Sequence, residues 1–440
     1  MRSILYWITT LLSVLLLSCG GDDVKMPWED DLGKGEQEQQ KPEPEPEPDN
    51  PTPDQPADNI IGQPLTPWSE GELDIHTIST GRGECLFFIL PDGTTMVVDA
   101  GEFSREPADY KNVLQRPNAQ TRPTKVYGDY IKHFLPQGKS AIDYCAPSHL
   151  HTDHIGGNDM VIGTAEAGYR KVGLTALYDY VPYNHILDSA YPTYTEDDVT
   201  PPIEGQLSQD WATFVTWGVK EGKFTADRFT PGKEQIVLVN NANRYKDFSL
   251  FNICANGFVW GKDKGGNAVL KGKKSGKGNP SSCGFHISYG DFDYLACGDL
   301  TSSAQNLMAH YFRDFIGCGN LDAFKSNHHL AGNSWGSQME KCNFNPRIVL
   351  NHCFAANKPH PKTLAHAVSV AEALFATNIH PSIAENPEVK AGKLLDKMTA
   401  YNGHIVLRVV PGGEYFYVYM LDDSDFEYRT KFISGPYKSK

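Results

Sequence analysis

Six consecutive residues, His149-Leu150-His151-Thr152-Asp153-His154, bring three imidazoles and one carboxylate together in this chain of 440 residues. They follow an apolar run at 141–146 that predicts a buried strand, and Gly156-Gly157 frees the backbone directly behind them. A strand end followed by a tight loop can direct such side chains into one cleft. Imidazole nitrogen and carboxylate oxygen are ligands that zinc, iron and manganese accept. The six residues therefore predict a metal site, and the alternative is a solvated histidine-rich loop.

Strands and helices alternate on both sides of this motif, which indicates an α/β protein. Apolar runs and turn residues predict strands at 73–78, 85–90, 96–99, 248–254, 283–292, 293–297, 347–352, 404–410 and 415–421, and a strand that leads into the loop at 323–334. Helices are predicted at 127–135, 302–315 and 362–376. Strand-rich halves with helices outside suit a four-layer αββα sandwich.

The motif His-x-His-x-Asp-His-x-Gly-Gly resembles the metal motif of the metallo-β-lactamase fold. Within that superfamily the best match is the metallohydrolase domain of bacterial DNA-uptake competence proteins, over about residues 70 to 420. Five segments look similar and come in the same order: 81–84 with 91–99, the motif at 149–157, 279–282, 289–299, and 328–334 with His360-Pro361. The resemblance implies the αββα sandwich and a metal-dependent hydrolase.

The resemblance also implies roles for residues outside the motif. Asp99 would lie beneath the metal site and orient the motif loop, and Asp299 would bridge two metal ions. One of His328 and His329 would be a further ligand. The usual third histidine of the first metal has no clear match. Asn279 and Ser282 stand near the position of that histidine in the sequence. His360 is a further candidate for the site, of lower priority.

We therefore expect a hydrolase with two divalent metal ions, with zinc as the default and manganese or iron possible. The first ion would be held by His149 and His151. The second would be held by Asp153, His154 and one of His328 or His329, with Asp299 as the bridge. Asp153 would orient the attacking water and accept its proton.

The substrate class is less constrained than the metal site. The resemblance favours a phosphodiester, so that the enzyme is a nuclease or a phosphodiesterase. A lysine-rich segment, which we expect to be a flexible loop, supports an anionic substrate through Lys262, Lys264, Lys271, Lys273, Lys274 and Lys277. The same segment can instead be a solvated surface. Hydrolysis of a lactone, β-lactam, amide or choline-phosphate ester, or a non-catalytic surface binding protein, are the alternatives.

The N-terminus predicts export and lipidation. Residues 1–18 have the apolar core of a signal peptide, and 16–20 resemble a bacterial lipobox that would make Cys19 the lipidated first residue. The Pro- and Glu-rich stretch within 19–65 cannot bury enough apolar surface to fold, so it predicts a disordered spacer. We expect a protein anchored by lipid in the bacterial cell envelope, on the periplasmic or surface face of the outer membrane.

The remaining chain, 66–440, is expected to form the hydrolase domain. The 145 residues between His154 and Asp299 are long for this fold, so about 160–280 is interpreted as an insertion over the cleft. Eight cysteines besides Cys19 occur in the chain, several inside strand-like runs, and no disulfide is assigned. The spacer holds 13 acidic and 3 basic residues, so the net charge of −14 says little about the partner of the domain.

The lipobox leads to a direct test. Cys19→Ser should abolish membrane fractionation and leave residues 66–440 folded, because the Cys19 thiol is the expected site of lipid attachment. Incorporation of a labelled fatty acid and fractionation of cells expressing the two proteins measure this. A Cys19→Ser protein that still carried the label would contradict the expectation.

Overall fold

The computed structural model describes residues 60–104, 112–198, 203, 205–275, 278–311, 321–337, 339 and 344–440. The predicted signal peptide, Cys19 and most of the predicted spacer lie outside these ranges, as does Lys277. From residue 60 on, the described residues belong to one compact unit that runs from Thr52 to Lys440. Within the described ranges, no helix has the length and apolar character needed to cross a membrane.

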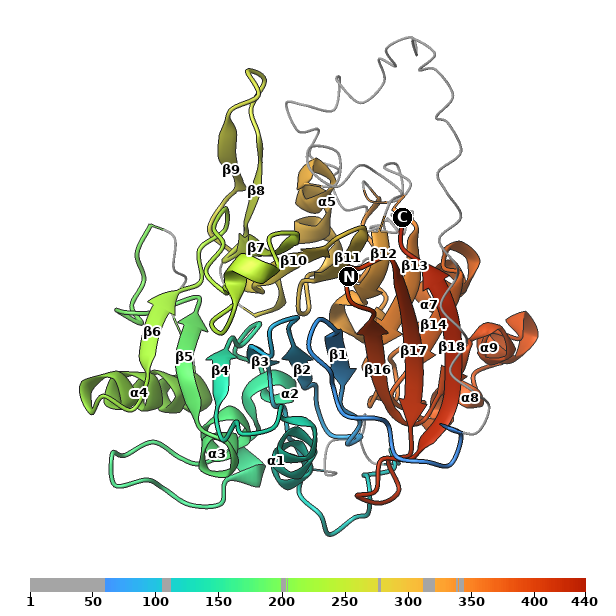
Figure 1. Ribbon diagram of the computed structural model, residues 1–440, viewed down its shortest axis with the longest axis horizontal. Coiled ribbons are helices and arrows are strands. Elements are labelled where there is room, and N and C mark those ends of the chain that lie inside the picture. The colour runs from blue at the N-terminus through green and yellow to red at the C-terminus, as the bar shows by residue number, and fades with distance from the viewer. Residues whose placement is uncertain are drawn as a thin grey trace, which may run out of the picture. The chain divides into compact units, whose positions relative to one another are not determined.

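The described strands form two nine-stranded sheets. Sheet one has the order β18 (Thr430–Lys438), β17 (Tyr415–Leu421), β16 (His404–Val409), β1 (Leu73–Thr77), β2 (Leu86–Ile89), β3 (Thr95–Val98), β4 (Ile142–Cys145), β5 (Tyr183–Asp188) and β6 (Thr225–Arg228) (Figure 1). From β18 to β3 the neighbours are antiparallel, and from β3 to β6 they are parallel.

Sheet two also combines parallel and antiparallel strands. Its order is β15 (Ala400–Tyr401), β14 (Ala373–Ala376), β13 (Pro346–Asn351), β12 (Leu321–Lys325), β11 (Phe292–Ala296), β10 (Gly284–Tyr289), β7 (Phe248–Ala255), β8 (Phe258–Lys262) and β9 (Ala268–Gly272). The strands from β11 to β15 are parallel, and the other neighbours are antiparallel.

The helices cover the outer faces of the two sheets. They are α1 (Pro123–Phe134), α2 (Thr152–Ile155), α3 (Gly173–Tyr180), α4 (Gln206–Lys220), α5 (Ser302–Tyr311), α7 (Pro361–Val370), α8 (Pro381–Ala384) and α9 (Pro387–Gly392). Apolar residues of α1, α3 and α4 share a core with sheet one, and those of α5 and α7 share a core with sheet two. A third core lies between the sheets. The predicted α/β class and four-layer αββα sandwich are confirmed.

The alternation of apolar residues along buried strands creates these separate cores. In β2, Phe88 belongs to the core between the sheets, where its ring lies 5.7 Å from that of Phe285 on β10. Its neighbours Phe87 and Ile89 point to the opposite face and pack in the core under α1. Successive side chains of a strand alternate between faces, so a strand that is apolar at every position is buried on both faces.

The segment predicted as an insertion takes part in both sheets. Within 160–280, β5 and β6 extend sheet one, and β7, β8 and β9 extend sheet two. The same segment contains α4, whose buried residues Trp211, Phe214, Val215 and Gly218 recur at helical spacing. Figure 1 shows β8 and β9 as a long hairpin that projects beyond β7.

The predicted helix at 362–376 is wrong in its second half. Helix α7 ends at Val370, and 373–376 forms the buried strand β14 beside β13. The four residues Ala-Leu-Phe-Ala fit a helix or a strand equally well by periodicity. Strand β18 at the far edge of sheet one was not predicted either.

A buried ion pair joins two strands of sheet one. Asp74 on β1 lies opposite Arg408 on β16, and the guanidinium donates from Nε to Oδ1 at 2.8 Å and from Nη2 to Oδ2 at 2.6 Å. Burial alone would raise the pKa of Asp74, but Arg408 outweighs it and lowers the pKa to about 2. A carboxylate with a lowered pKa stabilises the folded chain above its unfolded pKa.

This pair predicts a loss of stability in acid. The contribution of Asp74, about 2–3 kcal/mol, should be present above about pH 4 and should disappear as the pH falls toward 2. Urea unfolding between pH 5 and 2 measures it, with Asp74→Asn as the matched variant. The variant should be less stable at pH 5 and should lose less stability on acidification. Equal slopes for the two proteins would contradict the assignment.

Candidate metal centre

The site lies where the carboxyl ends of parallel strands from both sheets meet. The loops after β3 and β4 come from sheet one, and the loops after β11, β12 and β13 come from sheet two. Ligand sites of open α/β sheets lie outside the carboxyl ends of the strands, where the loops diverge and leave space. Every residue that the sequence predicts as a metal ligand follows one of these strands.

The motif loop after β4 is held against the loop after β3. A Cβ atom added to Gly101 would lie 1.8 Å from the carbonyl oxygen of Asp153, so glycine is required for this approach. The backbone N–H of Ala100 donates to the carbonyl of His154 at 2.8 Å. The motif then enters the single-turn helix α2, in which Asp153 and His154 are buried and His151 is exposed at the N-cap.

Asp99 takes the supporting position that the resemblance implies. Its backbone is left-handed, with φ of 63°, and its carboxylate accepts from the backbone N–H and the hydroxyl of Ser148, both at 2.7 Å. It also accepts from Nδ1 of His154 at 2.8 Å. This contact fixes the tautomer of His154 and turns Nε2 toward the cleft, as a carboxylate behind a metal-bound histidine does.

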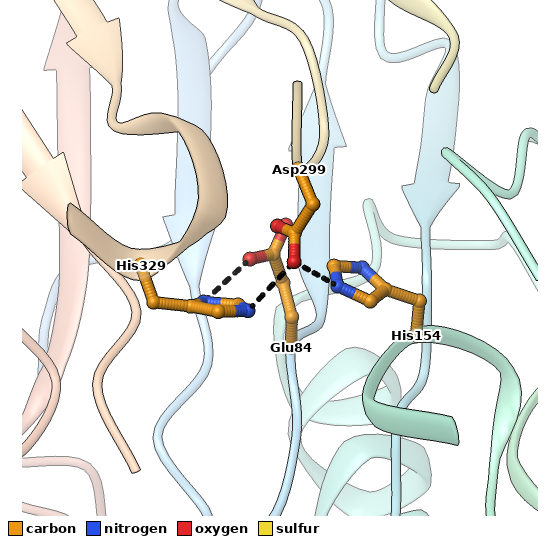
Figure 2. Close-up of side chains that lie close together, drawn as sticks. All are labelled: Glu84, His154, Asp299 and His329. Atoms are coloured by element: carbon orange, nitrogen blue, oxygen red, sulfur yellow. Dashed lines mark ion pairs between the residues drawn. The ribbon is translucent and has the colours of Figure 1, made fainter. Parts of the chain in front are cut away.

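The carboxylate of Asp299 contacts histidines that come from both sheets. Its Oδ2 lies 3.3 Å from Nε2 of His154, which comes from sheet one, and 3.2 Å from Nε2 of His329, which comes from sheet two (Figure 2). The carboxylate of Asp153 lies 3.5 Å from Nε2 of His329 and 3.9 Å from Nε2 of His154. The structure therefore brings Asp153, His154, His329 and Asp299 together as the sequence predicts for the second metal and the bridge.

The structure separates the roles of the two adjacent histidines. His328, His329 and Leu330 all have positive φ values, of 46°, 54° and 57°. This uncommon turn buries His329 beside Asp299 and leaves His328 at the edge of the cleft. His328 is held at Nδ1 by Asn333 and at Nε2 by Asn279, each at 3.0 Å. His329 is thus the ligand candidate, and the turn costs backbone strain of about 1–3 kcal/mol per residue.

The sequence did not predict three buried residues of this centre, which are Glu84, Lys325 and His352. Oε2 of Glu84 lies 3.5 Å from Nδ1 of His329 and 3.6 Å from Nδ1 of His352. Lys325 is buried between the carboxylates, with Nζ 2.9 Å from Oε1 of Glu84 and 3.8 Å from Oδ1 of Asp299. Only Lys325 could have been noticed, because it lies in the apolar strand before the two histidines and buried lysines are rare unless they are paired.

The charges of these groups balance one another. Burial acts against the charged form of His154, but the carboxylates of Asp299, Asp99 and Asp153 outweigh it and raise its pKa well above the ordinary value. Burial would likewise raise the pKa of Asp299, but His329 and His154 lower it well below the ordinary value. The opposite charges at this site therefore stabilise one another, whereas an isolated buried charge would be energetically costly.

His149 and His151 form a second group beside the first. Nε2 of His149 lies 3.0 Å from Nδ1 of His151, and Nδ1 of His149 lies 3.1 Å from the hydroxyl of Ser148. Burial lowers the pKa of His149 well below its ordinary value, so that its ring is neutral and able to bind a metal. Asn279 and His151 both line a cavity at the site, and Oδ1 of Asn279 has no hydrogen-bond partner among the described residues.

Two further predicted residues have supporting positions. The hydroxyl of Ser282 accepts from the backbone N–H of Asp299 at 3.1 Å and donates to the carbonyl of Asn279 at 2.9 Å. His360 caps α7 by accepting from the backbone N–H of Lys362 at 3.3 Å, and its own N–H donates to the carbonyl of Leu330 at 2.8 Å. His360 supports the turn that carries His329 and lies outside the group of converging ligand atoms.

The lysine-rich segment is not the flexible loop that was predicted. Its described part forms the end of β8, a turn and β9, and Lys274 pairs with Glu196 at 2.7 Å. None of its described lysines (Lys262, Lys264, Lys271, Lys273 and Lys274) lines the cavity at the site. The segment approaches the centre at Gly278, where an added Cβ would lie 2.6 Å from Nε2 of His151.

The described residues fit a divalent cation. Glu84, His154, Asp299 and His329 each offer one ligand atom, and these atoms lie within 4.8 Å of one another (Figure 2). Nε2 of His154 and Nε2 of His329 are buried, have no hydrogen-bond partner among the described residues and both face Oδ2 of Asp299. Buried polar atoms are normally satisfied, so unsatisfied atoms that converge on one point indicate a bound ion.

A cavity of about 410 Å³ opens above these ligands. Its lining comes from the motif loop, the start of α4 and the loops of sheet two: residues 150–153, Asn158, 205–208, Asn279, Asp299, His328 and Lys358. This volume suits a small molecule or one unit of a polymer.

Comparison with known proteins gives only distant matches. No family model matches the chain, and no curated protein matches it. Solved structures with some likeness include the diiron β-hydroxylase CmlA from Streptomyces venezuelae, with 13% identity and a TM-score of 0.34 over 78% of this chain and 55% of that chain. This chain thus spans about half the length of that hydroxylase.

Two further structures show a similar degree of likeness. A metallo-β-lactamase from Cronobacter sakazakii has 13% identity and a TM-score of 0.28, over 60% of this chain and 79% of that chain. A protein described as a metal-dependent hydrolase from Parabacteroides distasonis has 11% identity and a TM-score of 0.29, over 78% and 98%. Scores of this size do not decide a fold, which therefore rests on the sheet order and layers of this chain.

The two neighbouring histidines give a matched pair of variants. His329→Gln should lower the affinity for Zn²⁺ by about 100-fold or more, because it removes a nitrogen that points at Asp299. His328→Gln should change the affinity by less than about tenfold, because that ring is held by two asparagines. Metal content after dialysis against buffered Zn²⁺ measures both. Equal losses in the two variants would reject the assignment of His329.

Proposed function

We propose that this chain is a metal-dependent hydrolase with two divalent ions, held by the residues of both sheets. The observation that carries the proposal is the convergence of unsatisfied nitrogen and oxygen atoms around Asp299, next to the pair His149 and His151. The first ion would be held by that pair, the second by Asp153, His154 and His329, and Asp299 would bridge them. Zinc is the default, and iron or manganese would suit the same ligands.

Divalent ions in such a site supply Lewis acidity and lower the pKa of water toward neutrality. The residues of the chain supply the rest of the chemistry. Asp153 lines the cavity and contacts His329 at 3.5 Å, so its carboxylate can orient a water molecule and accept its proton. Asp99 holds the ring of His154 from behind, which keeps its ligand nitrogen in place, and Glu84 lies 3.5 Å from Nδ1 of His329 as a further candidate ligand.

A phosphodiester is the substrate class that we favour, so that the enzyme is a nuclease or a phosphodiesterase. Support comes from the resemblance of the motif segments to the competence-protein domain and from Lys358, which lines the cavity and has no ion-pair partner among the described residues. A lactone, β-lactam or amide is the alternative, since polarising a carbonyl needs the same ions. A binding protein without catalysis is the rival outside enzymes, and the convergence of buried ligand atoms around Asp299 argues against it.

We also propose that the enzyme acts in the bacterial cell envelope, attached to a membrane by a lipid on Cys19. The support for this is the lipobox-like sequence and the Pro- and Glu-rich stretch behind it, which would hold the domain away from the bilayer. A hydrolase in that place would meet substrates of the periplasm or of the cell exterior.

A substrate panel with one variant tests the proposal. The purified chain should bind about two metal ions and hydrolyse bis(4-nitrophenyl) phosphate, and Asp299→Ala should lose at least one ion and reduce the rate by about 100-fold or more. Single- and double-stranded DNA, RNA, a lactone and a β-lactam complete the panel. Full activity of Asp299→Ala would reject the bridging role, and turnover of the carbonyl substrates alone would select the alternative class.

A further inference from the structure

One wall of the cavity has no part in holding metal ions. This wall contains Lys358 from the loop after β13, residues 205–208 at the start of α4, and Asn158. Its polar groups are an ammonium, amides and a hydroxyl, which can all donate hydrogen bonds. The proposed metal ligands Asp153 and Asp299 line the same cavity. The cavity thus combines hydrogen-bond donors with the proposed metal ligands.

Lys358 is a cation without an anionic partner in the described part of the chain. Its backbone is fixed by a bridge to Ala355, and its side chain is half-buried in the cavity wall. It lines the cavity together with His151, Asp153 and His328, and its charge lowers the pKa of each of these groups. None of the carboxylates that the structure describes lies within ion-pair distance of Nζ, unlike Lys325, which is paired with Glu84.

The start of α4 adds further donors to the same wall. The helix begins at Gln206 after Gly205, and no side chain caps its N-terminus. The N–H groups of its first turn have no intrahelical acceptors, and they carry the positive end of the helix dipole. Ser208 in this turn is 4% exposed and lines the cavity. A ligand would satisfy these groups.

The charges around the centre argue against a purely compensating role for Lys358. Four carboxylates are buried there, on Glu84, Asp99, Asp153 and Asp299. Two divalent ions and Lys325 would carry five positive charges, which these carboxylates and one metal-bound hydroxide would balance. The charge of Lys358 would then have no counterpart, and a neutral substrate would leave it uncompensated in a half-buried place.

We propose that this cavity wall is an anion-binding subsite, in which Lys358 and the start of α4 hold a phosphate-like group of the substrate. The inference rests on the proposed metallohydrolase and specifies its substrate as one with a negatively charged group beside the scissile bond. Lys358 then determines specificity between anionic and neutral substrates. Lys262, Lys264, Lys271, Lys273 and Lys274 of the β8–β9 hairpin do not have this role, because they lie outside the cavity lining.

The test compares Lys358→Gln with Lys362→Gln in the metal-loaded full chain. Lys362 lies four residues further on, is exposed and is absent from the cavity lining, so it is a matched control. Calorimetry measures the Kd of inorganic phosphate, and metal content is checked in each protein. The Kd should rise by about tenfold to a hundredfold in Lys358→Gln. It should stay unchanged in Lys362→Gln, rise modestly in Ser208→Ala, and be partly restored in Lys358→Arg.

Kinetics give the second readout. Lys358→Gln should raise the KM for bis(4-nitrophenyl) phosphate by the same factor and leave the KM for the neutral ester 4-nitrophenyl acetate unchanged. Unchanged phosphate affinity in a fully metal-loaded Lys358→Gln protein would overturn the subsite, even if the phosphodiester is still hydrolysed. If the unmodified chain hydrolyses no phosphodiester, the proposed substrate class fails, while the loss of phosphate affinity in Lys358→Gln would still support the subsite.

Discussion

The contact of Asp299 with His154 and His329 is the constraint on which the centre depends. His154 follows a strand of sheet one, and His329 and Asp299 follow strands of sheet two, so the three groups meet only if the sheets pack face to face. The core between the sheets, with contacts such as that of Phe88 with Phe285, sets that spacing. A change of register or packing by a few ångströms would separate the ligand atoms, because such sites tolerate little displacement.

Several features of this centre are energetically unfavourable when taken by themselves. Asp99 and the turn from His328 to Leu330 have left-handed backbones, and Lys325 is buried among carboxylates. Strain and buried charge persist only where the surrounding structure, or a bound ion, compensates for them. A cation that binds the folded chain and not the unfolded chain would stabilise the fold through the same ligands. We therefore expect folding and metal binding to be coupled in this protein.

The cavity lining combines two groups of residues with different roles in the proposed enzyme. The proposed metal ligands come mainly from segments that lie next to strand ends of both sheets, and they would determine where the bond is broken. The donor part of the wall comes from α4 and from the loop after β13, and it would determine which molecules bind. Because α4 belongs to a segment that also adds strands to sheet one, this wall is built on the same rigid layers as the ligands.

The sequence by itself determined the features that are local. The motif at 149–154 places its candidate ligands within one loop, and each buried strand shows its own apolar pattern, so the α/β class, the sandwich and these ligands could be predicted. Asp299 and the pair His328 and His329 were predicted through the resemblance of their segments to the metallo-β-lactamase fold. The apolar pattern could not distinguish a helix from a strand in short runs. At 373–376, a strand beside β13 is found in place of the expected helix.

Only the tertiary structure decided what depends on distant neighbours. The choice of His329 over His328 follows from three left-handed residues and from two asparagines that hold the other ring. Glu84 and Lys325 acquire their roles through contacts between residues 241 positions apart, which periodicity cannot reveal. Lys358 differs from the lysines of the hairpin only in where it lies. Sequence patterns report which side chains a strand or loop presents, whereas their partners, and hence their charges and roles, are fixed by how the layers pack.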